Sequence, residues 1–129
     1  MKLLLDTHVL LWAASEPEQL TAQARDALED GSNDVLVSVV SAWEIAIKQS
    51  LGKLDLPRPA EQWLPEVLRR SGFELAEVGL AAALRVRALP WHHRDPFDRL
   101  LVAQSTLEAL VFVTTDGQLA PYGGLVRIV

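Results

Sequence analysis

The chain has 129 residues with a net charge of −5 at pH 7, and half of its residues are hydrophobic. This length is typical of one domain with its own hydrophobic core, so we expect a single domain over residues 1–129. The absence of cysteine excludes disulfide scaffolds and thiolate zinc sites and favours a cytoplasmic protein, and no apolar run approaches the roughly 20 residues that span a membrane.

Short apolar runs alternate with helical patterns along the whole chain. In order, we expect strand 2–5, helices 7–14 and 21–30, strand 34–38, helices 41–51 and 60–71, strand 73–78, helices 80–89 and 96–109, and strands 110–115 and 125–129. This alternation predicts an α/β sandwich with a central, mainly parallel sheet flanked by helices. In such sheets the functional crevice lies beyond the carboxyl ends of the strands.

Acidic residues fall at that edge of the predicted sheet. Asp6 directly follows the first strand, and Asp116 directly follows the strand LVFVTT. Glu44 and Asp98 are placed in the first turns of helices that follow strands or loops at the same edge, and Asp95 is a possible fifth member. Four separate segments therefore deliver carboxylates to one place.

Each acid also has an ordinary structural explanation when it is taken alone. These explanations are helix caps at Asp6-Thr7, Ser41 to Glu44 and Asp95 to Asp98, and a turn at Asp116-Gly117. The joint placement favours a site instead, because four unrelated caps need not converge. Convergent carboxylates repel one another by about 1 kcal/mol or more per close pair, which a bound cation offsets. Ligands that are all oxygen suit Mg²⁺ or Mn²⁺, ions that readily complete their coordination with phosphate oxygens.

Four motifs in this order resemble those of PIN-domain ribonucleases, in particular VapC-type toxins of bacterial toxin–antitoxin pairs. They are LLLDTHVLLW, SAWEIAIK, DPFDRLLVAQ and VTTD. The resemblance spans nearly the whole chain. It implies a PIN-like fold and metal-dependent endonucleolytic cleavage of RNA that leaves 5′-phosphate and 3′-hydroxyl ends.

Carried over by position, the resemblance implies that four acids form the catalytic and metal-binding set: Asp6, Glu44, Asp98 and Asp116. They would hold one or two Mg²⁺ or Mn²⁺ ions and activate a water. A carboxylate that does not ligate the ion, Asp98 or Asp116, could orient that water. Supporting or substrate-contacting groups would be Asp95, Thr7, Thr114, Thr115 and Arg99.

The resemblance also implies partners. These are an RNA substrate, a VapB-like antitoxin that places a helix in a hydrophobic groove, and a second copy of the chain in a homodimer. Excess apolar residues and tryptophans on helices 7–14 and 41–51 are the sequence features that fit such contacts. Arg99, next to Asp98, is expected to pair with a site carboxylate or to meet the antitoxin.

The basic residues between positions 85 and 99 have two interpretations. They are Arg85, Arg87, His92, His93, Arg94 and Arg99, and they form either a rim for the RNA backbone or a solvated helix face. We expect His92 and His93 to lie in a surface loop, and His8 to pack beside the first strand.

Other functions are weighed against the nuclease. A haloacid-dehalogenase-like phosphatase needs a second aspartate where His8 stands, and a receiver domain needs a late lysine that segment 110–129 does not have. The remaining alternative is a catalytically silent PIN-like or receiver-like binding or signalling domain with an acidic metal pocket.

Overall fold

A five-stranded sheet of order β3-β2-β1-β4-β5 forms the centre of the computed structural model, which describes residues 1–129. All four strand pairings are parallel, which confirms the predicted α/β sandwich. The strands are β1 (Lys2–Leu5), β2 (Asp34–Ser38), β3 (Glu74–Ala76), β4 (Val111–Thr114) and β5 (Val126–Ile128). Chain order reverses between β1 and β4, the position at which open parallel sheets form a crevice.

Six α-helices connect and cover the strands. They are α1 (Thr7–Ser15), α2 (Ala22–Glu29), α3 (Val39–Ser50), α4 (Ala60–Ser71), α5 (Leu80–Arg85) and α6 (Pro96–Glu108). Three short 3₁₀ helices are η1 (Pro17–Gln19), η2 (Val86–Ala88) and η3 (Gly117–Tyr122). No helix has the length and apolar character needed to cross a membrane.

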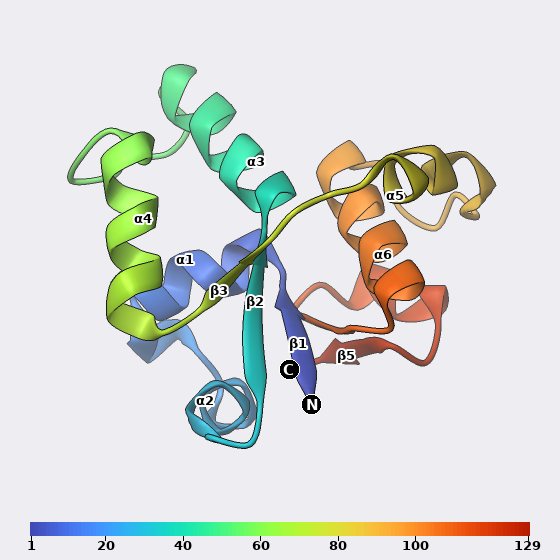
Figure 1. The fold of residues 1–129 in the computed structure, drawn as a ribbon, viewed down its shortest axis with the longest axis horizontal. Coiled ribbons are helices and arrows are strands. Elements are labelled where there is room, and N and C mark those ends of the chain that lie inside the picture. Colours follow the sequence, from blue (N-terminus) through green and yellow to red (C-terminus); the bar gives the residue numbers. More distant parts are fainter.

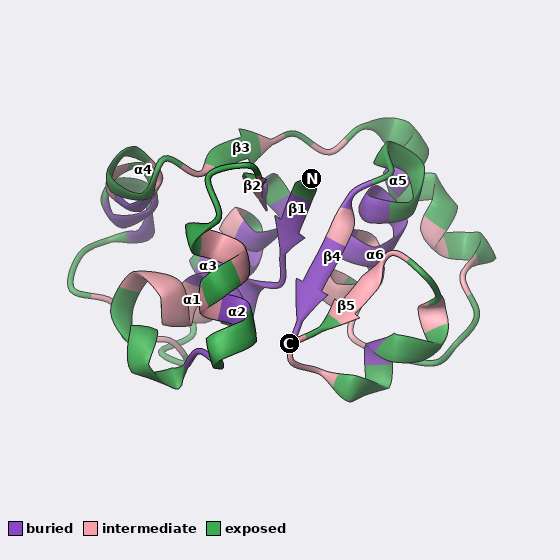
Figure 2. Ribbon diagram, turned by 90° about the horizontal axis from the view of Figure 1, so that it is seen from below, coloured by how far each residue is buried: buried purple, intermediate pink, exposed green.

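The sheet separates two hydrophobic cores because successive side chains of a strand point to opposite faces. Leu3 and Leu5 of β1 belong to one core, beneath α1, α2 and α4, whereas Leu4 belongs to the other, beneath α6. Figure 1 shows α1, α2 and α4 on one side of the sheet and α5 and α6 on the other. The buried residues concentrate in β1, β4 and the inner faces of the helices (Figure 2).

Three expected elements have a boundary that is wrong by two residues or more, whereas the other boundaries agree within one residue. The helix expected over 41–51 begins at Val39, because the Ser38 hydroxyl caps it by accepting from the Val40 amide at 3.0 Å. The helix expected over 80–89 is α-helical only to Arg85 and continues as η2. The strand expected over 73–78 keeps only Glu74–Ala76, the three residues that pair with β2.

Arg99 is buried on α6, with 2% of its surface exposed. Its guanidinium donates to the backbone carbonyls of Val86 and Pro90, each at 2.9 Å, and to the Tyr122 hydroxyl at 3.2 Å. It also stacks 3.7 Å from the centre of the Trp91 ring. Arg99 therefore organises the loop before α6 and forms no ion pair with a site carboxylate, so that expectation is wrong. Its contact with an antitoxin stays a prediction.

Replacing Arg99 by lysine is expected to lower the free energy of unfolding by about 2–4 kcal/mol, because one ammonium cannot satisfy carbonyls on both sides of the guanidinium. Urea denaturation monitored by circular dichroism measures the loss. The matched control is Arg87→Lys at an exposed position of η2, which should change stability by less than about 0.5 kcal/mol. Equal effects of the two substitutions would contradict this role.

Candidate functional site

The carboxyl ends of the strands open into a cleft of about 390 Å³. All four predicted acids line it, together with Asp95, so the convergence expected from their positions in the sequence does occur. The full lining consists of Asp6, His8, Trp12, Glu44, Lys48, His93, Asp95, Asp98, Thr115 and Asp116. The starts of α1, α3 and α6 all lie at this end of the sheet (Figure 1).

Thr114 fixes two of the acids relative to each other. Its hydroxyl donates to Oδ2 of Asp6 at 2.6 Å and accepts from the backbone N–H of Asp116 at 3.0 Å. The Asp6 amide donates to the Val113 carbonyl at 2.9 Å, which keeps the end of β1 beside the end of β4. Of the two threonines proposed from the sequence, Thr114 orients Asp6 and Thr115 lines the cleft.

Glu44 reaches the cleft from the second turn of α3, since that helix starts earlier than expected. Glu44 is 5% exposed; its Oε2 forms an ion pair with Lys48 one turn further on, and Oε1 has no hydrogen-bond partner. Ser41 does not form a capping box with Glu44. It instead accepts a hydrogen bond at 2.8 Å from Thr7, which ties α1 to α3.

Asp95 and Asp98 have different roles at the start of α6. Oδ1 of Asp95 accepts from the amides of Phe97 at 2.8 Å and Asp98 at 3.0 Å, so Asp95 is the helix N-cap. The side chain of Asp98 is therefore free to face the cleft. A buried contact between Ser38 and Gln104, at 2.6 Å, holds α6 against the start of α3.

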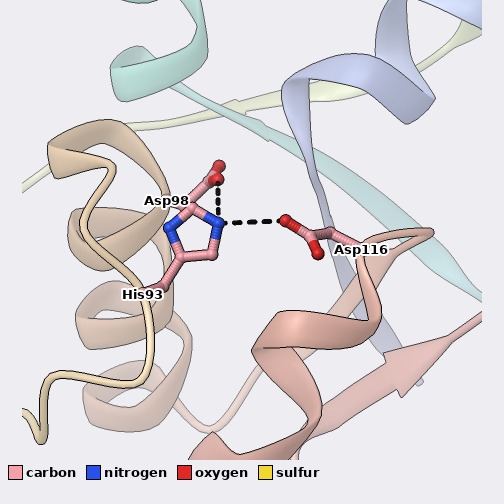
Figure 3. Close-up of side chains that lie close together, drawn as sticks. All are labelled: His93, Asp98 and Asp116. Carbon is pink, nitrogen blue, oxygen red and sulfur yellow. Dashed lines mark hydrogen bonds and ion pairs between the residues drawn. The ribbon is translucent and has the colours of Figure 1, made fainter.

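His93 joins the site, although the sequence placed it in a surface loop. Its Nε2 lies 3.0 Å from Oδ2 of Asp116 and 3.5 Å from Oδ2 of Asp98 (Figure 3). Nδ1 accepts from the Asp95 amide at 3.0 Å. This hydrogen bond assigns the proton of the neutral ring to Nε2, which then donates toward the two carboxylates.

Two other histidines and one lysine lie at or near the cleft, and only part of their arrangement was expected from the sequence. His8 is exposed and lines the cleft, so its expected packing beside the first strand is wrong. His92 is exposed, as expected, and contacts Tyr122. Lys48 was missed, although its spacing of four residues from Glu44 places both on one face of a helix and could have revealed it.

Negative charge accumulates at Asp98. Burial, followed by the charges of Asp6, Asp95, Glu44 and Asp116, raises the pKa of Asp98 to about 8. A carboxyl group that ordinarily ionises near 4 therefore keeps its proton at neutral pH when no cation is bound. The crowding of like charges predicted from the sequence is present and lacks full compensation.

The pKa values of two neighbours are also displaced. Burial raises the pKa of Asp6, and the hydrogen bond from Thr114 opposes that shift only in part. Burial disfavours the charged form of Lys48, but its hydrogen bond to Glu44 and the surrounding negative charges outweigh burial and raise its pKa above the usual value. Lys48 therefore stays positively charged within the cleft.

The side chains that could hold a metal ion include a compact group. Ligand atoms of His93, Asp98 and Asp116 lie within 4.8 Å of one another. The unpaired Oε1 of Glu44 and the carboxylate of Asp6 line the same cleft. Clustered carboxylate oxygens with one imidazole are suitable ligands for a divalent cation.

Comparison with known proteins decides the family. The sequence model of the PIN domain family matches residues 3–125, almost the entire chain. The chain belongs to the PIN domain family. The resemblance seen in the four sequence motifs is thereby confirmed.

Relatives of this PIN domain carry ribonuclease names. Ribonuclease VapC22 of Mycobacterium tuberculosis is 30% identical over 119 residues, which cover 90% of this chain and 88% of the relative. Ribonuclease VapC16 of the same organism is 39% identical over 66 residues, 51% of this chain and 47% of the relative, so that match spans about half of each protein.

A solved structure supports the fold of the PIN domain. The VapBC2 complex of Rickettsia felis, bound to a DNA fragment from its promoter, contains a chain that aligns with a TM-score of 0.72. The alignment covers 99% of this chain and 97% of the other, at 15% identity. It shows the same arrangement of sheet and helices.

The crowding at Asp98 predicts how the stability of the metal-free PIN domain depends on pH. The folded state holds a proton on Asp98 up to about pH 8, whereas the unfolded state releases it near pH 4. Stability contributed by this group therefore falls as pH rises between these values, by at most about 1.4 kcal/mol per pH unit. Asp98→Asn should remove this decline and be more stable than wild type at pH 8 in EDTA.

Chemical denaturation at pH 5, 6, 7 and 8 tests the prediction. The difference between wild type and Asp98→Asn at each pH isolates Asp98 from other titrating groups. The exposed Asp26 provides a matched control, because Asp26→Asn should leave the wild-type slope unchanged. Parallel curves for wild type and Asp98→Asn would contradict the proposed crowding.

Proposed function

We propose that this chain is a Mg²⁺-dependent endoribonuclease of the VapC type, with Mn²⁺ as an alternative ion. The observation that carries the proposal is the convergence of Asp6, Glu44, Asp98 and Asp116, from four separate segments, on one cleft. The ribonuclease names of the relatives support RNA as the substrate.

The cleft fits a hard divalent cation. Glu44 presents a buried oxygen without any partner, which is costly unless a ligand satisfies it. The raised pKa of Asp98 indicates that positive charge is insufficient in the cleft, although Lys48 already contributes one. We propose Asp6, Glu44, Asp98 and Asp116 as the residues that hold the ion.

The chain's own side chains prepare this site for hydrolysis. When bound, the ion would lower the pKa of a water and stabilise charge on the phosphodiester oxygens. Thr114 orients Asp6, and Asp95 caps α6 so that Asp98 faces inward. His93 donates from Nε2 toward Asp98 and Asp116 and thereby keeps their carboxylates aligned before the substrate arrives.

Cleavage of an end-labelled RNA pool by purified protein tests the activity. We expect cuts at defined positions with Mg²⁺, none with EDTA, and at least about a 100-fold loss in Asp6→Asn, because loss of a ligand weakens the positioning of the ion. The matched control is Asp55→Asn at an exposed loop position, which should cleave as wild type does.

The same assay separates the nuclease from a catalytically silent binding or signalling domain. A folded wild-type protein that gains thermal stability with Mg²⁺ yet cuts no RNA would favour the silent domain. Cleavage that persists undiminished in Asp6→Asn would instead indicate a contaminating nuclease and contradict the proposed site.

We also propose a VapB-like antitoxin as a partner. The structural neighbour belongs to VapBC2 and the relatives are named VapC, which supports such a partner. A groove beside α1, lined by Ala13 and Ala14 together with Val67, Arg70 and Ser71 of α4, offers an apolar floor for an amphipathic helix.

A homodimer is the second proposed assembly. Leu80 and Leu84 of α5 are 75% and 65% exposed, and Leu107 of the adjacent α6 is 43% exposed. Leu80 and Leu84 lie one turn apart and so share a face of α5, and exposed leucines on one helical face are typical of an interface. Leu84→Glu should convert a dimer to a monomer in analytical ultracentrifugation, because each of the two copies would bury one negative charge at the interface. Leu51→Glu, at an equally exposed leucine after α3, should remain dimeric; a monomeric wild type would overturn the dimer.

A further inference from the structure

The cleft has a single apolar element, which the hydrolytic chemistry does not use. Trp12 is the only hydrophobic residue among those that line it. His8 lies one turn earlier on the same face of α1, and the two rings meet edge to face with centroids 4.9 Å apart at an angle of 78°. Both rings line the cleft beside the carboxylates.

Packing against the core does not fully explain why Trp12 lies in the wall of the cleft. Trp63 is an ordinary core residue, since it is 7% exposed and lines no part of the acidic cleft. Trp12 contacts the same hydrophobic core but is only partly buried, and it also forms a wall of the cleft. The exposed Trp43 and Trp91 are engaged elsewhere, with Phe97 and Arg99 respectively.

The position of Trp12 along α1 places it close to the proposed metal ligands. Asp6 is the residue from which α1 begins, and Trp12 follows six residues later, about 9 Å along the helix axis. Helical side chains lean toward the N-terminus of their helix, so the indole is directed back over His8 and toward Asp6. The separation is on the scale of one nucleotide.

An aromatic wall supplies what this cleft otherwise lacks. Its carboxylates repel the phosphates of RNA, and the only lysine that lines it is already paired with Glu44. Stacking of a base on an indole needs no charge, and it is available only to a base that is not held in a duplex. A base held there would position the adjoining phosphodiester over the acids.

We propose that Trp12 and His8 form a stacking subsite for an unpaired nucleobase of the nucleotide next to the cleaved bond. This inference rests on the proposed function, because the adjoining phosphodiester is the one that is cut.

Abasic substitution in the substrate tests the subsite. The probe is a short RNA around a cut site identified in the RNA pool, prepared with one abasic nucleotide at each position flanking the cut. For wild type, one abasic position should lower kcat/KM by roughly 5- to 100-fold. In Trp12→Leu, which keeps an apolar side chain against the core, the same abasic change should cost little. Trp12→Phe should restore part of the dependence.

Each variant is compared with itself on intact and on abasic RNA, so a reduced stability of Trp12→Leu does not obscure the result. His8→Ala, at an exposed position, should give a smaller loss at the same nucleotide. A second readout is tryptophan fluorescence with Ca²⁺ as the ion: the intact RNA should quench a component of the wild-type emission that Trp12→Phe lacks, and the abasic RNA should not.

The outcomes separate the two proposals. Suppose that wild type cleaves RNA, but that each abasic position lowers kcat/KM of Trp12→Leu by the same factor as it lowers kcat/KM of wild type. The stacking subsite is then wrong and the nuclease stands. If folded wild type with Mg²⁺ cuts no RNA, both proposals fall. Equal cleavage of the same sequence within a stable duplex would also overturn the subsite.

Discussion

Mutual repulsion among carboxylates held at one edge of a parallel sheet is the constraint on which this structure depends. The register of β1 with β4 places Asp6 and Asp116 at neighbouring strand ends, where the Asp6 amide bonds to Val113 of β4 and the Asp116 amide bonds to the Thr114 hydroxyl. Lys48, His93 and a proton on Asp98 offset part of the repulsion, while the acids stay close together. A stable core is therefore maintaining an unfavourable cluster, which is characteristic of functional sites.

The fold and the four acids could be predicted because both follow from local patterns. Apolar runs ending in Asp6 and Asp116 identify strands and the residues that leave them, and parallel topology brings these residues to one edge. The start of α3 was misplaced because the β-branched Val39 and Val40 extend the strand pattern, and Ser41 with Glu44 imitates a capping box. The hydroxyl of Ser38, buried against Gln104, decides the boundary through a tertiary contact.

His93 and Arg99 could not be placed from local patterns alone. The loop that carries His93 is ordered by carbonyl contacts with Arg99, which lies on α6 after it in sequence. Helical geometry predicts part of the position of Arg99, since adjacent residues such as Asp98 and Arg99 do not share a face of a helix. Arg99 therefore points away from the cleft into which Asp98 projects. Adjacency in sequence to a site acid therefore does not predict contact with it on a helix.

The cleft also joins two separately packed halves of the molecule. Trp12 and Glu44 come from α1 and α3, whereas Asp98 and Asp116 come from α6 and the segment after β4, on the other side of the view in Figure 2. Each half contributes one basic side chain to its acids, Lys48 in one and His93 in the other. The acids are not fully satisfied, because Oε1 of Glu44 has no partner and Asp6 accepts its hydrogen bond from Thr114 of the other half. A cation shared by the four acids would replace repulsion between the halves by attraction to a common charge. Ion binding would then stabilise the packing of the layers as well as the site, which couples the order of the cleft to the presence of its ligand.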